Sequence, residues 1–222
     1  MINKMPGEYD QKFASYRAFL AYMMAHPGKK LLFMGQEFGQ MNEWNYQTQL
    51  DWNLMEFDSH KNLLKFSEKL NKFYAENSPM WQNDDSWGGF SWISNDDYRQ
   101  SVIAFRRIDD NGDEIIAVCN FVPVERNDYR IGVPYKGRYK LMFNTDAKEF
   151  GGSGISEKSF KTENEPMHGQ DQSISMTLAP LSVVYLKYAP VKKRTPKTEA
   201  AEEVLEKPKK TRKKAAEKSS DK

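Results

Sequence analysis

Two glutamates and a tryptophan follow a short apolar segment in the first quarter of the sequence. The run Lys30–Gly35 leads into a polar stretch that holds Glu37, Glu43 and Trp44. Two carboxylates can share general acid and base work when their surroundings separate their pKa values, and they can also accept hydrogen bonds from sugar hydroxyls. The indole of Trp44 offers a large, flat apolar face suited to a pyranose ring. A structural role fits the same residues, with a Glu paired to a buried Arg and the Trp filling a barrel rim.

The elements that must position these residues can be predicted from apolar spacing. Asp10 can cap a helix that ends at His26-Pro27-Gly28, and Ser59 can cap a second helix that ends before Pro79. Between them we expect a strand at Lys30–Gly35. A buried parallel strand that ends in polar residues is typical of the active-site end of an α/β barrel. One strand and two helices cannot close a sheet, so this region needs further strands.

From about Ser86 the pattern changes to that of short strands. The cluster Asp109-Asp110-Asn111-Gly112 favours a tight hairpin, and the glycine-rich segment from Gly151 to Gly169 indicates a long surface loop. Seven short strands separated by turn residues predict an antiparallel β-sandwich of roughly 100 residues. We predict them at Phe90–Ile93, Ser101–Arg106, Glu114–Phe121, Asp128–Val133, Arg138–Asn144, Ser173–Leu178 and Ser182–Tyr188.

Charge is divided unevenly along the chain. Residues 191–222 hold 12 Lys or Arg and 6 Asp or Glu, a net of +6, so the remaining residues carry −4 of the overall +2. With few large apolar residues, this tail is predicted to be disordered. Its basic run Lys207–Lys214 could contact phosphates, but it contains no aromatic residue to stack on bases. Solubilisation is therefore favoured over binding to nucleic acid.

Several function classes lack their signatures in this sequence. His26, His60 and His168 are widely separated and lack the ligand spacing of zinc sites, so no metal is expected. The glycines at 151–154 precede neither a helix nor a Lys-Ser/Thr pair, so no nucleotide cofactor is expected. The single cysteine, Cys119, lies in an apolar run and is expected to be a buried small hydrophobe. The sequence has neither a run of roughly 18 apolar residues nor a signal core, which predicts a soluble, cytoplasmic protein.

Ordered blocks along the chain resemble one enzyme family. The chain resembles the bacterial 1,4-alpha-glucan (glycogen) branching enzymes of the alpha-amylase superfamily from about Ile2 to Tyr188. The blocks that carry this resemblance are Met5-Pro6-Gly7, Ala25–Gly35, Glu37-Phe38, Glu43-Trp44-Asn45, Leu50-Asp51-Trp52, Phe105-Arg106-Arg107, Asn120–Pro123, Tyr129–Gly132 and Asn144-Thr145-Asp146.

The resemblance implies a fold and a reaction. Residues 1–85 would be the end of a catalytic (β/α)8 barrel, residues 86–190 the carboxyl-terminal β-sandwich, and residues 191–222 a tail outside the resemblance. Enzymes of this family move an α-1,4-linked glucan segment to a 6-hydroxyl with retention, through an Asp nucleophile and a Glu acid/base. These groups precede the Met-Pro-Gly block in the family, so we expect the chain to lack the catalytic acids and to be inactive without the amino-terminal part of the enzyme.

The resemblance also implies which residues meet the substrate. Glu37 would lie at the end of the eighth barrel strand, and Glu43, Trp44 and Asn45 in the following loop, where all four would shape the glucan cleft. The alternative is a non-catalytic glucan-binding module that uses exposed aromatic residues such as Trp87 and Trp92. Core packing is the favoured interpretation of those two indoles, because both lie near the start of the sandwich.

Overall fold

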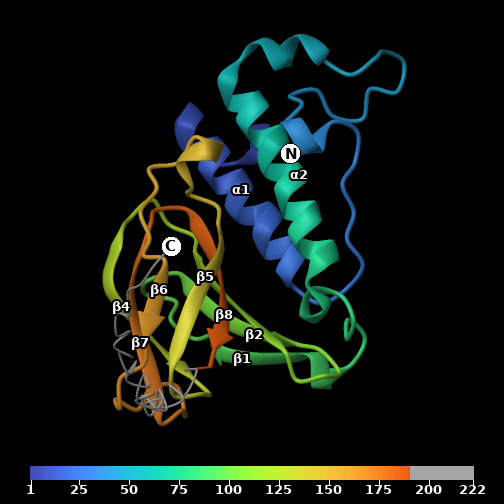
Figure 1. Ribbon diagram of the computed structural model, residues 1–222. Coiled ribbons are helices and arrows are strands. Elements are labelled where there is room, and N and C mark those ends of the chain that lie inside the picture. The colour runs from blue at the N-terminus through green and yellow to red at the C-terminus, as the bar shows by residue number, and fades with distance from the viewer. Residues whose placement is uncertain (191–222) are drawn as a thin grey trace, which may run out of the picture. The chain divides into compact units, whose positions relative to one another are not determined.

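The computed structural model describes residues 1–190 and contains two long helices beside two antiparallel sheets (Figure 1). The helices are α1 (Tyr9–Ala25) and α2 (Asp58–Glu76), which pack on one another. The strands are β1 (Phe90–Ser94), β2 (Val102–Ile108), β3 (Glu114–Asn120), β4 (Arg126–Val133), β5 (Arg138–Asn144), β6 (Ser159–Lys161), β7 (Gln172–Leu178) and β8 (Ser182–Ala189). The predicted disorder of residues 191–222 lies outside the described residues.

The six-stranded sheet is the middle layer of the molecule. Its order is β1-β2-β3-β8-β5-β6, and β4 pairs with β7 in a separate sheet. Every strand pair is antiparallel. Alternate residues of β3 enter different cores, since Ile115 and Ala117 face the helices while Ile116 and Val118 face the β4–β7 pair. All residues of β3 are therefore buried, as expected for a strand covered on both faces.

The core beneath the helices combines residues from both predicted regions. Tyr16 and Leu20 of α1 belong to one buried cluster with Phe105 of β2 and Tyr185 of β8. A hydrogen bond also joins α1 to β8, in which the Tyr185 hydroxyl donates to the Ala21 carbonyl oxygen at 2.5 Å. Residues 1–190 lie within one compact unit, so the boundary at residue 85 stays a prediction.

The predicted strand at Lys30–Gly35 is absent, which corrects the sequence interpretation. The chain there is extended but forms no ladder, and Phe33 instead bonds Gln36, whose backbone N–H donates to the Phe33 carbonyl oxygen at 3.1 Å. A strand is defined by its hydrogen-bonded neighbours. Within residues 1–190 no strand pairs with this segment, although its apolar character is that of a strand.

Both helices begin differently from the prediction. Glu8, and not Asp10, caps α1 through a capping box with Gln11, whose side-chain oxygen accepts from the Glu8 N–H at 3.1 Å. Helix α2 begins one residue before Ser59, and the Ser59 hydroxyl instead bonds the Tyr9 hydroxyl at 2.8 Å. In the described residues, no helix is both long and apolar enough to cross a bilayer.

Candidate functional site

The loop after the extended segment is folded around buried groups. Gly39 has a φ of +73°, and a Cβ there would lie 2.8 Å from Leu63 Cδ2, so this turn requires glycine. The Gln40 side chain holds the loop together, because its amide donates to the Asn42 carbonyl oxygen at 2.9 Å and its oxygen accepts from the Asp51 N–H at 3.0 Å. Phe38 is buried and stacks on Trp52 with ring centroids 5.1 Å apart. The loop is thus anchored at several points.

Glu37 and Glu43 engage different neighbours in this loop. Glu37 is half-buried in a short 3-10 helix (Gln36–Phe38), and its backbone carbonyl accepts from Ser67 Oγ at 2.8 Å. Burial raises the pKa of the Tyr16 hydroxyl, and the charge of Glu37 adds to that shift. Glu43 pairs with the Lys4 ammonium at 3.0 Å. Glu43 therefore fits the structural role of an ion-pair partner, which the sequence left open.

Trp44 and Asn45 lie at the exposed surface of the same loop. Trp44 is 72% exposed, and its ring packs on Phe33 with centroids 4.6 Å apart. The Asn45 side-chain oxygen accepts from the Gln47 N–H at 3.3 Å. One face of the Trp44 indole is thus supported by Phe33 while the side chain remains accessible. The substrate contacts of Glu37, Glu43, Trp44 and Asn45 remain predictions.

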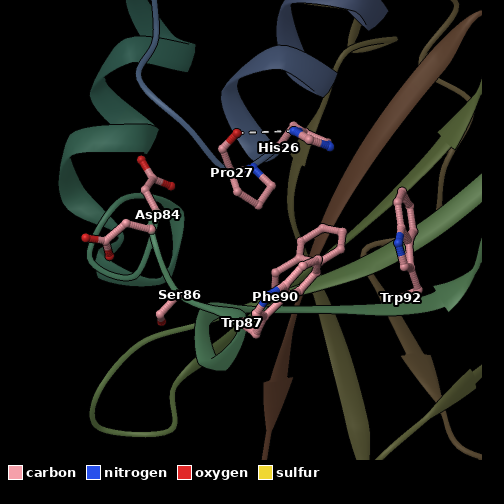
Figure 2. A pocket seen from close by; sticks show the side chains of 8 residues that line it. His26, Pro27, Asp84, Ser86, Trp87, Phe90 and Trp92 are labelled. Atoms are coloured by element: carbon pink, nitrogen blue, oxygen red, sulfur yellow. Dashed lines mark hydrogen bonds between the residues drawn. The ribbon is translucent and has the colours of Figure 1, made fainter.

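A second feature, which we call the aromatic pocket, lies between the end of α1 and the start of β1 (Figure 2). Its volume is about 510 Å³. The residues that line it are His26, Pro27, Asp84, Asp85, Ser86, Trp87, Phe90 and Trp92. Figure 2 shows Asp84 and Ser86 on one side of the view, Trp92 on the other, and Phe90 between them.

The two indoles of the aromatic pocket are exposed, so the core-packing interpretation is wrong. Trp87 is 89% exposed and Trp92 is 41% exposed. Trp92 meets Phe90 edge-on with centroids 4.9 Å apart and Phe105 edge-on at 5.6 Å, so its indole is only partly covered. Trp87 lies in the short 3-10 helix Trp87–Gly89 before β1. Two glycines, Gly88 and Gly89, follow Trp87, and they could have predicted a surface turn from the sequence.

A buried ion pair lies beside the aromatic pocket. Arg107, which is completely buried, donates to Asp84 Oδ1 at 2.6 Å. The other oxygen, Asp84 Oδ2, is buried and has no hydrogen-bond partner in residues 1–190. The nearby Lys30 is half-buried, and burial lowers its pKa to about 8 although Asp84 opposes that shift. The accessible surface of the pocket is therefore mainly aromatic, and the Asp84 carboxylate is buried against Arg107.

The histidines and the cysteine have local roles. The buried His60 bonds the Phe38 carbonyl oxygen through Nδ1 at 2.8 Å, and His26 bonds the Pro27 carbonyl oxygen at 3.2 Å. In the described part of the chain, no three His, Cys, Asp or Glu residues are grouped to hold a metal ion. Cys119 is buried in the core beneath the helices, and burial raises its pKa.

Comparison with known proteins defines first the class of the β domain. Residues 92–189 match the family described as "Alpha amylase, C-terminal all-beta domain". Two solved structures share the fold at low sequence identity. The catalytic module of the pneumococcal glycogen-degrading protein SpuA has a TM-score of 0.57 at 13% identity, covering 82% of this chain and 32% of that one. The Group B Streptococcus pullulanase has a TM-score of 0.54 at 16% identity, covering 81% and 28%.

Higher sequence identity is found to bacterial branching enzymes. The chain is 50% identical over 190 residues to the 1,4-alpha-glucan branching enzyme of Aquifex aeolicus, covering 85% of this chain and 30% of the relative. It is 47% identical over 189 residues to that of Halothermothrix orenii, covering 84% and 30%. The resemblance found in the sequence blocks is confirmed, and the chain is related to the carboxyl-terminal part of the bacterial branching enzymes of the alpha-amylase superfamily. It spans about 30% of the length of these relatives.

Proposed function

We propose that this chain forms the carboxyl-terminal part of a 1,4-alpha-glucan branching enzyme. The enzyme is a retaining glycosyltransferase that cleaves an α-1,4-linked glucan and transfers the segment to a 6-hydroxyl, forming the α-1,6 branches of glycogen. The observation that carries this proposal is 50% identity over 190 residues to a branching enzyme. The reaction needs no metal or organic cofactor in this assignment. Its cytoplasmic location stays a prediction.

Residues 1–85 serve as the end of a (β/α)8 barrel in this proposal. The extended segment before Gly35 has the apolar character of a strand, and Leu31 within it is 72% exposed. Unpaired backbone groups along an extended apolar segment form a ready edge for another strand. The amino-terminal part of the enzyme would supply the neighbouring barrel strands. Large exposed aromatics of the same region, including Trp52 and Phe57, add apolar surface for that partner to bury.

The loop from Glu37 to Asn45 would form one wall of the glucan cleft. Trp44 is the residue best placed to meet a sugar, because Phe33 supports its ring while most of the indole remains exposed. Glu37 and Asn45 would add hydrogen bonds to hydroxyls, and Glu43 would fix the loop through its ion pair with Lys4. The nucleophile and the acid/base would come from the amino-terminal part, so the chain alone should not branch amylose.

Complementation tests this assignment. The chain is incubated with amylose, alone and together with the separately produced amino-terminal part of the Aquifex aeolicus relative, and iodine absorbance and α-1,6 linkages are followed. We expect no reaction from the chain alone and activity from the mixture. Branching by the chain alone would contradict the division of catalytic groups, and a mixture that neither associates nor reacts would contradict the barrel assignment.

A matched pair of variants tests the role of Trp44 in the complemented enzyme. Trp44→Ala should raise KM for amylose, because the indole face on which a sugar ring would stack is lost, whereas Tyr46→Ala should not. Tyr46 is an appropriate control because it lies in the same loop and is also exposed. Equal KM values for the two variants would contradict the proposal that a sugar ring stacks on Trp44.

The aromatic pocket supports a second candidate function, which is non-catalytic binding of α-glucan. The supporting observations are the pocket itself and the exposed indoles of Trp87 and Trp92 that line it. Affinity electrophoresis of the chain in glycogen gels tests this function. Trp87→Ala and Trp92→Ala should migrate faster than the parent in glycogen, while Trp81→Ala, an exposed indole outside the pocket lining, should not. Equal retardation of all variants would exclude the aromatic pocket as a glycogen-binding site.

A further inference from the structure

Four basic side chains lie together on one face of β5, β6 and β8, which are neighbouring strands of the six-stranded sheet (Figure 1). Arg138 of β5 pairs with Lys161 of β6. Lys140 of β5 pairs with Lys187 of β8. Between the two β5 cations, Tyr139 is buried in the core shared with β4 and β7. Because side chains alternate along a strand, the four cations lie on the opposite face of the sheet, which we call the basic face.

Three of the four cations of the basic face have no ionic partner. Arg138, Lys140 and Lys161 are exposed, and none of them forms a salt bridge within residues 1–190. Lys187 pairs with the Asp113 carboxylate at 3.0 Å. Like charges directly opposite one another in a sheet are destabilising. The basic face therefore lowers the stability of the isolated chain, and an anionic partner would reverse that effect.

A cavity of about 350 Å³ lies next to the basic face along β5. It is formed by that strand, helix α2 and the short 3-10 helix Lys148–Phe150. Met142, two residues beyond Lys140, is 43% exposed and lines the cavity together with Phe73 and Phe143. An accessible thioether beside two aromatic rings is suited to receive an aliphatic side chain. We call this feature the α2–β5 cavity.

The charged residues that line the α2–β5 cavity are already paired with one another. Lys69 bonds the Glu149 carboxylate, and Lys72 pairs with Glu76 at 3.8 Å. Charges are therefore balanced at the cavity and unbalanced on the basic face. A ligand that fits both surfaces must carry acidic groups and an apolar group on one chain.

A protein segment fits these two surfaces better than a nucleic acid. Alternate side chains of a strand are roughly 6.6 Å apart, so Arg138 and Lys140 match alternate acidic residues of an extended peptide. A peptide can also present an aliphatic side chain to Met142, which a nucleic acid cannot. The other residues paired with these two cations are Ser159 and Ala189, so no aromatic ring accompanies them for base stacking.

We propose that the basic face and the α2–β5 cavity together dock an extended acidic segment of a partner protein. Acidic side chains at alternate positions pair with Arg138, Lys140 and Lys161. An aliphatic side chain further along the same segment enters the cavity beside Met142. This docking function goes beyond the proposed branching reaction, whose glucan substrate is neutral.

Fluorescence anisotropy of a labelled peptide titrated with the full chain tests the proposal. The peptide alternates Glu with Ser and carries Leu at both ends, and it should bind more tightly than a matched peptide with Gln in place of Glu. Arg138→Gln/Lys140→Gln should weaken its binding by about fivefold, through the loss of two exposed ion pairs. Lys61→Gln/Arg99→Gln is the matched control, because it removes the same two charge types from exposed positions on α2 and on the β1–β2 loop. The basic tail is present in every variant and is therefore not a variable.

Two further variants separate docking from general charge attraction. Met142→Ala should weaken binding of the peptide with Leu ends by about threefold and leave a peptide with Ser ends unaffected. Lys161→Gln removes one exposed cation from the edge strand β6 and should weaken binding by about twofold. The charge variants should melt at or above the temperature of the parent chain, because like-charge repulsion is reduced.

The affinities decide between docking and its alternatives. Equal affinity of the acidic peptide for the parent, for Arg138→Gln/Lys140→Gln and for Lys161→Gln would overturn the proposal. Tighter binding of an oligouridylate of the same charge, with the same losses in the charge variants, would also overturn it and assign the basic face to nucleic acid. Neither result bears on complementation by the amino-terminal part, so failure of the docking surface and failure of the branching function are distinguishable.

Discussion

Arg107 ties three segments of the chain together at a fully buried position. Its guanidinium donates to the Asp84 carboxylate at 2.6 Å, to the Ala25 carbonyl oxygen at 2.8 Å and to the Gly89 carbonyl oxygen at 3.2 Å. One residue of β2 thereby holds the end of α1 and the whole loop that carries Trp87. We predict that this arginine is among the most sensitive positions of the molecule.

The expected loss in free energy of unfolding follows from the groups that Arg107→Met leaves unpaired. Two backbone carbonyls lose a charged donor, and Asp84, whose side chain is 6% exposed, becomes a buried carboxylate without its cation. Removing one partner of a buried ion pair costs about 3–5 kcal/mol. That cost is a large share of the roughly 5–15 kcal/mol by which a domain is stable. The variant should therefore unfold at a much lower urea concentration.

Urea unfolding followed by tryptophan fluorescence measures the change. Arg138→Met is the matched control, because Arg138 is exposed and bonds only the Ser159 hydroxyl at 3.0 Å, so its effect should stay within about 0.5 kcal/mol. Adding Asp84→Leu to Arg107→Met should recover part of the loss, because the unpaired charge is then gone. A loss below about 1 kcal/mol for Arg107→Met, or no recovery in the double variant, would refute this reasoning.

Three further predictions concern single groups. Burial lowers the pKa of Lys30 to about 8, from an ordinary value of 10.5. Between these two values the unfolded chain holds the Lys30 proton and the folded chain has lost it, so the free energy of unfolding should increase as pH rises through that window. Competitive acetylation read by mass spectrometry checks the value, and titration near 10.5 would contradict it. Cys119 should react with a thiol reagent only on unfolding, because burial raises its pKa; rapid reaction of the native chain would show that the helix layer opens. Gly89→Ala should destabilise the fold by about 1–3 kcal/mol, because its Cβ would lie 2.1 Å from the Asn83 carbonyl oxygen, whereas Gly88→Ala, with 3.6 Å to the Ser86 hydroxyl, should be tolerated in the same thermal melt.

The strands of the β domain could be predicted from sequence because they are specified locally. All seven predicted strands are present with ends within about two residues, since alternation and turn residues suffice to define them. The missed strand, β6, has only three residues and lies at the sheet edge opposite β1. Its pairing with β5 is a tertiary contact that no local pattern announces.

The remaining differences also arise where the outcome depends on distant contacts. The segment Lys30–Gly35 has the composition of a strand, but the neighbours that would make it one are not among residues 1–190. The exposure of Trp92 could not be predicted, because the pattern of a strand does not show how much of its face other elements cover. For the candidate loop, sequence located Glu37, Glu43, Trp44 and Asn45 together, but it could not distinguish the ion-paired Glu43 from the exposed Trp44.

The single core shared by α1 and the six-stranded sheet limits how such enzymes can be recombined. Phe105 and Tyr185 from the sheet pack with Tyr16 and Leu20 from the helix, so a hybrid that joined the β strands of one relative to the helices of another would place two unmatched surfaces in contact. Exchanging α1, α2 and the β strands as one block keeps every one of those contacts within a single parent. Productive crossovers in this region should therefore fall before Tyr9 and not at the start of the β domain.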